Sequence, residues 1–400
     1  MAEYEFPHTW DKTPEKAEEK QRGSERRGRR PQRGSILINK GKLDLPFLAL
    51  TMVILTIGVI MVLSASFARA YYETGNPTKI FIRQLFFAVS GVALMILASR
   101  VGIKIIRMYS KVIMLACIFL LILVLAIRTI GGGSKRWIDL GFTTFQPSEM
   151  AKLAVILYFA AMACRYKNKM KTFRYGILPF LGYLGVIVIL LALEPHFSAI
   201  IIIGLLSVAM MFAGGSNMKH LAILAVIGAG GIALLLLTTG YTSDRITAWR
   251  DPFSVAQGDG WQIVQSLYAV GSGGLLGLGL GQGRQKYLYL PEEHNDYIFS
   301  IACEELGFIG AMLILVLFAL LIIRGYWIAL RARDRYSALI TIGITTLLAI
   351  QVFLNVAVVT NFIPSTGISL PFFSYGGTAL WMQMIEMGII LGVSRNIEDM

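Results

Sequence analysis

The chain contains about ten apolar runs, each close to the roughly 20 residues that an α-helix needs to cross the hydrocarbon core of a bilayer. Their centres lie near residues 56, 90, 120, 157, 184, 204, 229, 311, 348 and 382. Of the 400 residues, 56% are hydrophobic and 15% are charged, and the mean hydropathy is +0.64, which excludes an ordinary soluble globule. The sequence therefore predicts an all-α polytopic membrane protein with about ten transmembrane helices.

Residues 1–42 differ from the rest of the chain because they contain few apolar residues and hold the basic run KQRGSERRGRRPQRGSILINKGK. Such a composition cannot form a core, so we expect a disordered cytoplasmic tail, followed by a membrane domain over residues 43–396. Beside a membrane span, a basic run favours contact with anionic lipid headgroups over nucleic acid. The three cysteines predict neither a disulfide framework nor a metal site.

Lys and Arg alternate between the loops that join the apolar runs. The loops at 100–111, 165–174 and 324–335 are basic, whereas those at 194–196 and 360–370 contain no Lys or Arg. By the positive-inside rule, both termini are cytoplasmic and one long loop, about residues 239–296 between spans seven and eight, is extracellular.

This orientation places several ionisable residues near the outer ends of spans: Arg83, Glu149, Lys152, Glu194 and Asp296. A charge at membrane depth is costly unless it faces a protein-lined cavity and finds a partner. Each residue alone could instead cap a helix or extend to the interface. Glu149 and Lys152 are three residues apart and can share a helix face. Together the set favours a polar cavity open to the outside.

Asp296 has two interpretations. With Asn295 it could cap the eighth span, which contributes about 1 kcal/mol. Alternatively, a carboxylate at the water boundary of a cavity suits a general base acting on a hydroxyl. Glu292, Glu293 and His294 are expected in a solvated loop. Glu304 and Glu305 further along could be either cavity or structural residues, and the sequence leaves that choice open.

Two segments are rich in glycine or proline. GSGGLLGLGLGQGR (271–284) has no preceding strand and no GK[ST], so it predicts a tight loop against the membrane and not a nucleotide site. Arg284 at its end could bind a pyrophosphate or be an ordinary interfacial charge. NFIPSTGISLPFFSYGG (361–377) would interrupt a span, so it either lines the same cavity or marks a turn between spans.

Three segments resemble the signatures of the SEDS family, the FtsW/RodA/SpoVE group of bacterial cell-wall polymerases. They are FQPSEMAKL, QSLYAVGSGGLLGLGLGQGRQKYLYLPEEHNDYIFSIACEELGFIG and PSTGISLPFFSYGG. The resemblance extends from the first span to about residue 395, is greatest to FtsW and its sporulation relative, and excludes the basic tail. Asn295 stands where many members have Thr, and Thr378 where Ser is common.

The resemblance implies a ten-span peptidoglycan glycosyltransferase at the outer face of the cytoplasmic membrane. It would polymerise lipid II, an undecaprenyl-pyrophosphate-linked disaccharide peptide, by an inverting mechanism. Family members act with a class B penicillin-binding protein, a transpeptidase, and with other division proteins, which predicts a place at the division septum. The sequence leaves open whether the role is division, elongation or sporulation.

The family motif also implies functional residues. Asp296 matches the catalytic carboxylate, Glu149 and Lys152 match a pair in the fourth span, and Arg83 matches a cavity arginine. We also expect Arg284 and Ser374 to bind substrate, together with Arg83, Glu149 and Lys152. No cofactor is certain, and participation of a divalent cation, Mg²⁺ or Mn²⁺, is left open.

Two other classes of function share the predicted cavity. A lipid II flippase would need alternating access, but the charges lie on one side only, and no matching pair of half-helices is visible. A non-catalytic division scaffold would not need Asp296 or Lys152.

Overall fold

The computed structural model describes residues 41–131, 136–139, 141, 143–238, 246–258 and 260–397. The predicted tail therefore lies almost entirely outside the described residues. The helices are α2 (Leu45–Thr74), α3 (Lys79–Arg100), α4 (Ile103–Gly131), α5 (Pro147–Tyr166), α6 (Phe173–Gly176), α7 (Leu178–Leu193), α8 (Phe197–Ala213), α9 (Met218–Thr238), α11 (Trp261–Ser272), α12 (Ile298–Leu330), α13 (Arg335–Val359) and α14 (Gly377–Ser394). A 3₁₀ turn, η2 (Lys167–Lys171), follows α5.

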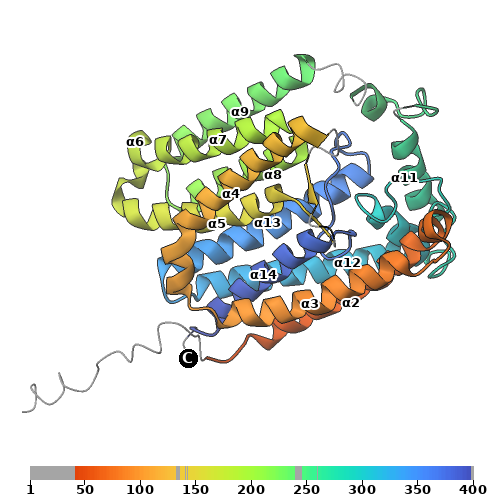
Figure 1. The fold of residues 1–400 in the computed structure, drawn as a ribbon, viewed down its shortest axis with the longest axis horizontal. Helices are drawn as coiled ribbons and strands as arrows, with labels where there is room; N and C mark the ends of the chain where they lie inside the picture. The colour runs from red at the N-terminus through yellow and green to blue at the C-terminus, as the bar shows by residue number, and fades with distance from the viewer. Residues whose placement is uncertain are drawn as a thin grey trace, which may run out of the picture.

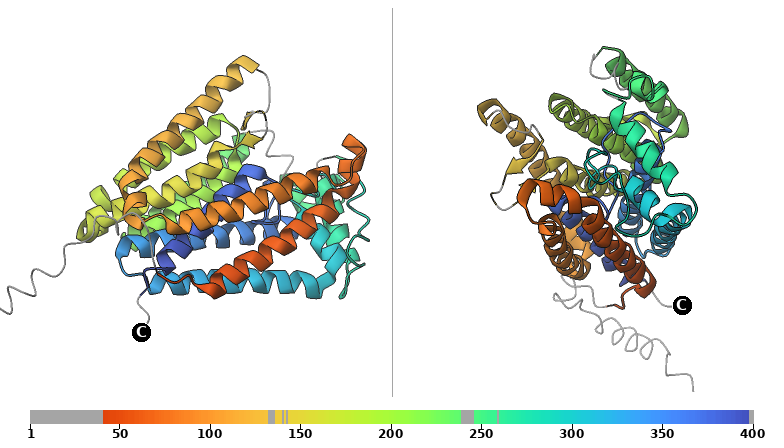
Figure 2. Two further views of the ribbon diagram at one scale, coloured as in Figure 1. Left: turned by 60° about the horizontal axis from the view of Figure 1, so that its bottom comes forward. Right: turned by 90° about the vertical axis from the view of Figure 1, so that its right-hand side faces the viewer.

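The expected all-α membrane architecture is confirmed. In the described part of the chain, eight helical segments are long and apolar enough to cross a membrane. The apolar helices α8 and α9 complete the set of about ten predicted spans. The long helices run roughly along one direction, and α9 lies at the edge of the bundle, where it packs on α8 (Figures 1 and 2).

The two ends of the described chain meet at one end of the bundle. Arg395 donates a hydrogen bond to the carbonyl of Gly41 (3.1 Å), and the backbone N–H of Asp44 donates to Ser394 Oγ (3.2 Å). Asp44 also pairs with Arg324 at 2.8 Å near the end of α12. A chain that begins and ends on the same side of a bundle crosses it an even number of times, as ten spans require.

Helices α5, α13 and α14 are the most buried of the spans. Because α5 is apolar on all sides, it is suited to a central position in the bundle. Next to its start is a short antiparallel hairpin of β1 (Ile138–Asp139) and β2 (Thr144–Phe145), with Ile138 opposite Phe145. The hairpin approaches α14, since Thr378 Oγ1 donates to the carbonyl of Thr144 (3.0 Å).

Helix α12 begins later than the sequence suggests. Its first residue is Ile298 and Tyr297 occupies the N-cap position, so Asp296 lies one residue before the N-cap, in the preceding loop. The helix is also interrupted at Gly307, whose backbone has φ 68° and ψ −172°. Such a conformation strongly favours glycine.

The break in α12 holds the glycine loop, residues 271–284. The carbonyls of Glu304 and Glu305 accept from the backbone N–H groups of Leu278 and Gly279, each at 3.0 Å. Non-helical backbone at membrane depth needs hydrogen-bond partners from the protein, and the carbonyls at the break in α12 provide them.

The side chains of Glu304 and Glu305 continue this anchoring. Glu304 accepts from the backbone N–H of Arg284 (2.8 Å), and Glu305 from that of Gly281 (3.0 Å). Glu305 also pairs with Lys286 at 2.7 Å, with both side chains almost fully buried. These two carboxylates, which the sequence left undecided, therefore have a structural role.

Candidate active site

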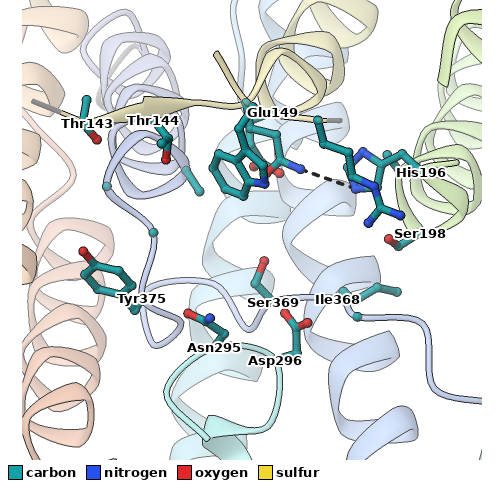
Figure 3. A pocket seen from close by; sticks show the side chains of 18 of the residues that line it. Thr143, Thr144, Glu149, His196, Ser198, Asn295, Asp296, Ile368, Ser369 and Tyr375 are labelled. Carbon is teal, nitrogen blue, oxygen red and sulfur yellow. Dashed lines mark hydrogen bonds between the residues drawn. The ribbon is translucent and has the colours of Figure 1, made fainter. Parts of the chain in front are cut away.

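A cavity of about 670 Å³ lies where the loops around α5, α8, α12 and α14 converge (Figure 3). It contains four of the residues predicted from the sequence: Arg83, Glu149, Lys152 and Asp296. The polar residues that join them on its wall are Arg136, Asp139, Thr143, Thr144, Gln146, His196, Ser198, Glu292, Asn295, Gln351, Ser369 and Tyr375. The predicted gathering of charges of both signs is therefore present.

Asp296 points into this cavity beside Ser369 and Ile368 (Figure 3). Its Oδ2 lies 3.2 Å from the place that a Cβ would occupy on Gly367, whose φ of +66° also favours glycine. The carboxylate therefore lies close to bare backbone. In the same loop, Asn295 donates to Glu292 Oε2 at 2.6 Å.

Glu149 and Lys152 form the pair that their spacing predicts. Lys152 Nζ lies 2.7 Å from Glu149 Oε2, with the side chains 5% and 12% exposed respectively. Pro147 occupies the first turn of α5, which directs both residues toward the cavity from the start of the helix. A lysine this deeply buried needs a carboxylate partner to remain charged.

The sequence did not identify Arg136 or His196 as part of the site. Arg136 donates to the carbonyls of Pro195 (2.6 Å) and Glu194 (3.4 Å), so it holds the turn between α7 and α8. His196 in that turn is buried and contacts Gln146 at 3.5 Å. Burial, with smaller contributions from the charges of Arg136 and Lys152, lowers the pKa of His196 to about 3. This imidazole is neutral at pH 7.

Three helices begin at the cavity, and in none of them does the side chain of the N-cap residue accept a hydrogen bond from the first turn. Their N-cap residues are Gln146 for α5, His196 for α8 and Gly376 for α14, all on the cavity wall. A helix N-terminus carries partial positive charge and free N–H groups. Together with Arg83, Arg136 and Lys152, they make a wall suited to an anionic group.

Arg284 and Ser374 are not on the cavity wall among the described residues. The side chain of Arg284 is exposed, while its backbone N–H is held by Glu304. Ser374 Oγ donates to the carbonyl of Asn295 (2.8 Å) and accepts from the N–H of Leu370 (2.7 Å). Ser374 therefore joins two loops, and its expected contact with substrate stays a prediction.

Glu293 was expected in a solvated loop, but its side chain is 0% exposed and bonds Arg69 of α2 through two contacts of 2.7 and 2.8 Å. Burial raises the pKa of Glu293, but the nearby His294 and the hydrogen bonds from Arg69 outweigh burial and hold the pKa below its ordinary value. The loop that carries Asp296 is thereby fixed to the C-terminal part of α2.

Comparison with known proteins gives a consistent result. The FtsW/RodA/SpoVE family model, described as cell cycle protein, matches residues 45–399. "Stage V sporulation protein E" of Bacillus subtilis is 42% identical over 354 residues, which cover 88% of this chain and 97% of that protein. The "Probable peptidoglycan glycosyltransferase FtsW" of Coxiella burnetii is 40% identical over 354 residues, covering 87% and 95%.

Two solved structures are also similar to this chain. One, described as "Structural coordination of polymerization and crosslinking by a peptidoglycan synthase complex", matches with a TM-score of 0.71 and 26% identity, over 88% of this chain and 98% of the other. The rod shape determining protein RodA of Thermus thermophilus matches with a TM-score of 0.66 and 25% identity, over 89% and 98%.

Proposed function

Because this chain belongs to the FtsW/RodA/SpoVE family, we propose that it is a peptidoglycan glycosyltransferase that polymerises lipid II into glycan strands. The observation that carries the proposal is the cavity itself, in which the Asp296 carboxylate shares one space with cationic groups and three helix N-termini. A carboxylate base and a site for an anionic leaving group are the two parts that glycosyl transfer from a diphosphate requires.

In the proposed reaction, Asp296 accepts the proton of the 4-hydroxyl of the acceptor sugar. The hydroxyl oxygen attacks the anomeric carbon of the donor, and the bond from that carbon to the diphosphate oxygen breaks. The electron pair of that bond leaves with the polyprenyl diphosphate. Attack from one face and departure from the other is a single displacement, which inverts the anomeric configuration.

The departing diphosphate needs stabilisation as its charge develops. Lys152, Arg83 and Arg136, with the starts of α5, α8 and α14, supply it in our proposal. Glu149 orients Lys152 through the 2.7 Å contact. Arg284 and Ser374 are not needed for this arrangement.

A divalent cation remains a proposal. Among the described residues, no group of three or more His, Cys, Asp or Glu side chains could hold a metal ion. Mg²⁺, however, is often bound by one or two carboxylates together with substrate phosphates. Glu292 and Asp296 are the carboxylates on the cavity wall that fit this mode, with the lipid diphosphate supplying the other oxygens.

We further propose that both termini are cytoplasmic, because the basic loops 165–174 and 324–335 favour that side. The partner we propose is a class B penicillin-binding protein, since one structural neighbour is a complex that coordinates polymerisation with crosslinking. Membrane lipids surround the bundle. The setting is the division septum with other division proteins, with sporulation as the alternative that the Bacillus subtilis relative raises.

The test is polymerisation of labelled lipid II by purified protein, alone and with its co-purified transpeptidase. We expect glycan ladders from the wild type and a loss of about 10²- to 10⁴-fold in rate for Asp296→Asn, the range for removing a general base. Asp251→Asn, which neutralises an exposed carboxylate outside the cavity, is the matched control and should retain the wild-type rate. A chelator arm with Mg²⁺ or Mn²⁺ added back tests the cation.

Near-normal polymerisation by Asp296→Asn would reject the assigned base. Absence of ladders from the wild type under every partner condition would reject the polymerase. The same preparation would then be assayed for lipid translocation, which separates a flippase from a scaffold.

A further inference from the structure

A single buried amide joins the two backbone segments that form the reactive wall of the cavity. Asn355 of α13 is 0% exposed. Its Nδ2 donates to the carbonyl of Asp296 at 2.8 Å and to the carbonyl of Ile368 at 2.7 Å. An amide nitrogen has two hydrogens, so both are used by these two acceptors.

The two acceptors belong to different loops on the same cavity. Asp296 precedes α12, whereas Ile368 lies between Gly367 and Ser369 in the loop before α14. All four residues line the cavity, and Asp296 and Ile368 lie on adjacent parts of the wall in Figure 3. The Asn355 amide therefore sets the separation between the Asp296 carboxylate and the backbone beside it.

Asp296 and Ile368 both lie in loop segments outside the helices, and each carbonyl accepts a hydrogen bond from Asn355. Loss of a hydrogen bond to a buried carbonyl is unfavourable, so the bonds to Asn355 favour the observed position of both loops. Ser374 Oγ to Asn295 O (2.8 Å) and Tyr375 N–H to His294 O (2.9 Å) join the same loops nearby. Asn355 differs from these in bonding the backbone of Asp296 itself.

We propose that Asn355 is a positioning residue for glycosyl transfer, which holds the Asp296 carboxylate at a fixed distance from the Gly367–Ser369 backbone. The proposal rests on the proposed function. Asn355 is not on the cavity wall, so it acts through Asp296 and not on the substrate. A misplacement of about 1 Å in a reacting group can reduce a rate by about 10²-fold.

The decisive variants are Asn355→Asp and Asn355→Ala. Asn355→Asp keeps the size of the side chain but replaces the donating nitrogen with oxygen, so the two carbonyls face an acceptor. Thr345→Val is the matched control, because Thr345 is a polar residue of the same helix and is 1% exposed. For both Asn355 variants, kcat should fall about 10- to 100-fold while KM for lipid II stays within about twofold.

Hydrogen–deuterium exchange provides a readout that does not require activity. In both Asn355 variants, amides of residues 292–297 and 366–376 should exchange faster, while those of α5 do not change. A merely structural role would instead lower Tm and raise exchange throughout the bundle, with an unchanged kcat per folded molecule.

Gly367→Ala tests the same separation without touching Asn355, in case the Asn355 variants do not fold. The added Cβ would lie 3.2 Å from Asp296 Oδ2 at a backbone φ that disfavours it, so kcat should again fall with little change in KM. Wild-type kcat in Gly367→Ala, or unchanged exchange in folded Asn355 variants, would overturn the positioning role. Failure of the wild type to polymerise would reject the proposed function, and the exchange measurement would still decide whether Asn355 clamps the two loops.

Discussion

His196 is a single residue whose position in the fold determines its protonation. The ordinary pKa of histidine is about 6.5, whereas burial beside Arg136 and Lys152 lowers the pKa of His196 to about 3. Between these two values the unfolded chain binds a proton that the folded chain does not. Stability therefore rises with pH across this window and is lost as the pH falls from about 6.5 toward 3.

We expect His196→Gln to weaken this pH dependence. The Tm of the wild type should fall as the pH is lowered from 7.5 to about 4.5, and the fall should be shallower in the variant, because glutamine does not take up a proton. His220→Gln on α9, which is outside the cavity, is the matched control. Equal slopes in wild type and His196→Gln would contradict a neutral, buried imidazole.

At the residue scale, the sequence predicts contacts between residues that are close in the chain, but it does not predict contacts between residues that only the tertiary fold brings together. Glu149 and Lys152 could be paired in advance because their spacing on one helix brings them together. Arg136 and His196 come from two separate turns whose meeting no periodicity reveals. Arg284 lies off the cavity wall, and the sequence could not show this, because a position at the end of a glycine-rich run does not tell which way the loop folds.

At the scale of elements, the glycine loop and the broken helix α12 act as one unit. The glycines predicted a tight loop, but the sequence does not show that the interruption at Gly307 provides its hydrogen-bond acceptors. The Glu305–Lys286 pair adds a buried charge contact, which Ser64 of α2 joins at 2.7 Å to Glu305 and 3.0 Å to Lys286. The unit is therefore fixed to α2 as well.

Removing one member of this pair should destabilise the protein more than removing both. Lys286→Met leaves the Glu305 charge buried without its cation, and a broken buried pair typically costs about 3–5 kcal/mol. In the double variant Glu305→Gln/Lys286→Met no charge is left, so we expect a Tm above that of Lys286→Met. The measurement is thermal unfolding in detergent, together with limited proteolysis of residues 271–289.

Arg284→Gln is the matched control for this pair, since its side chain is exposed and its backbone N–H is retained. It should leave Tm and the rate of loop cleavage unchanged. If the fall in Tm of the double variant equalled the sum of the falls in the two single variants, the charges of Glu305 and Lys286 would contribute to stability independently, which would contradict the prediction.

At the scale of the whole molecule, the number of spans is the feature that the sequence predicts best. An apolar run of sufficient length has few alternatives to a transmembrane helix. In a bilayer every backbone N–H and C=O group needs a hydrogen bond within the protein, and a helix provides it. The contacts of Arg395 with Gly41 and of Asp44 with Ser394 bring the two ends of the described chain together at one end of the bundle, as an even number of crossings demands. The cavity, in contrast, is formed largely by loops. The bilayer does not restrict their backbone to one conformation, so the sequence does not predict how they fold.

Topology can be tested with single cysteines because the native ones do not interfere. Cys117, Cys164 and Cys303 are all buried, so a membrane-impermeant maleimide should not label the wild type. Lys42 and Arg284 are exposed and lie on opposite sides if residues 239–296 are extracellular. In spheroplasts, Arg284→Cys should be labelled directly, and Lys42→Cys only after the membrane is permeabilised. Labelling of Lys42→Cys in sealed spheroplasts would place the start of α2 outside and, because α14 ends beside it, would reverse the orientation of the cavity as well.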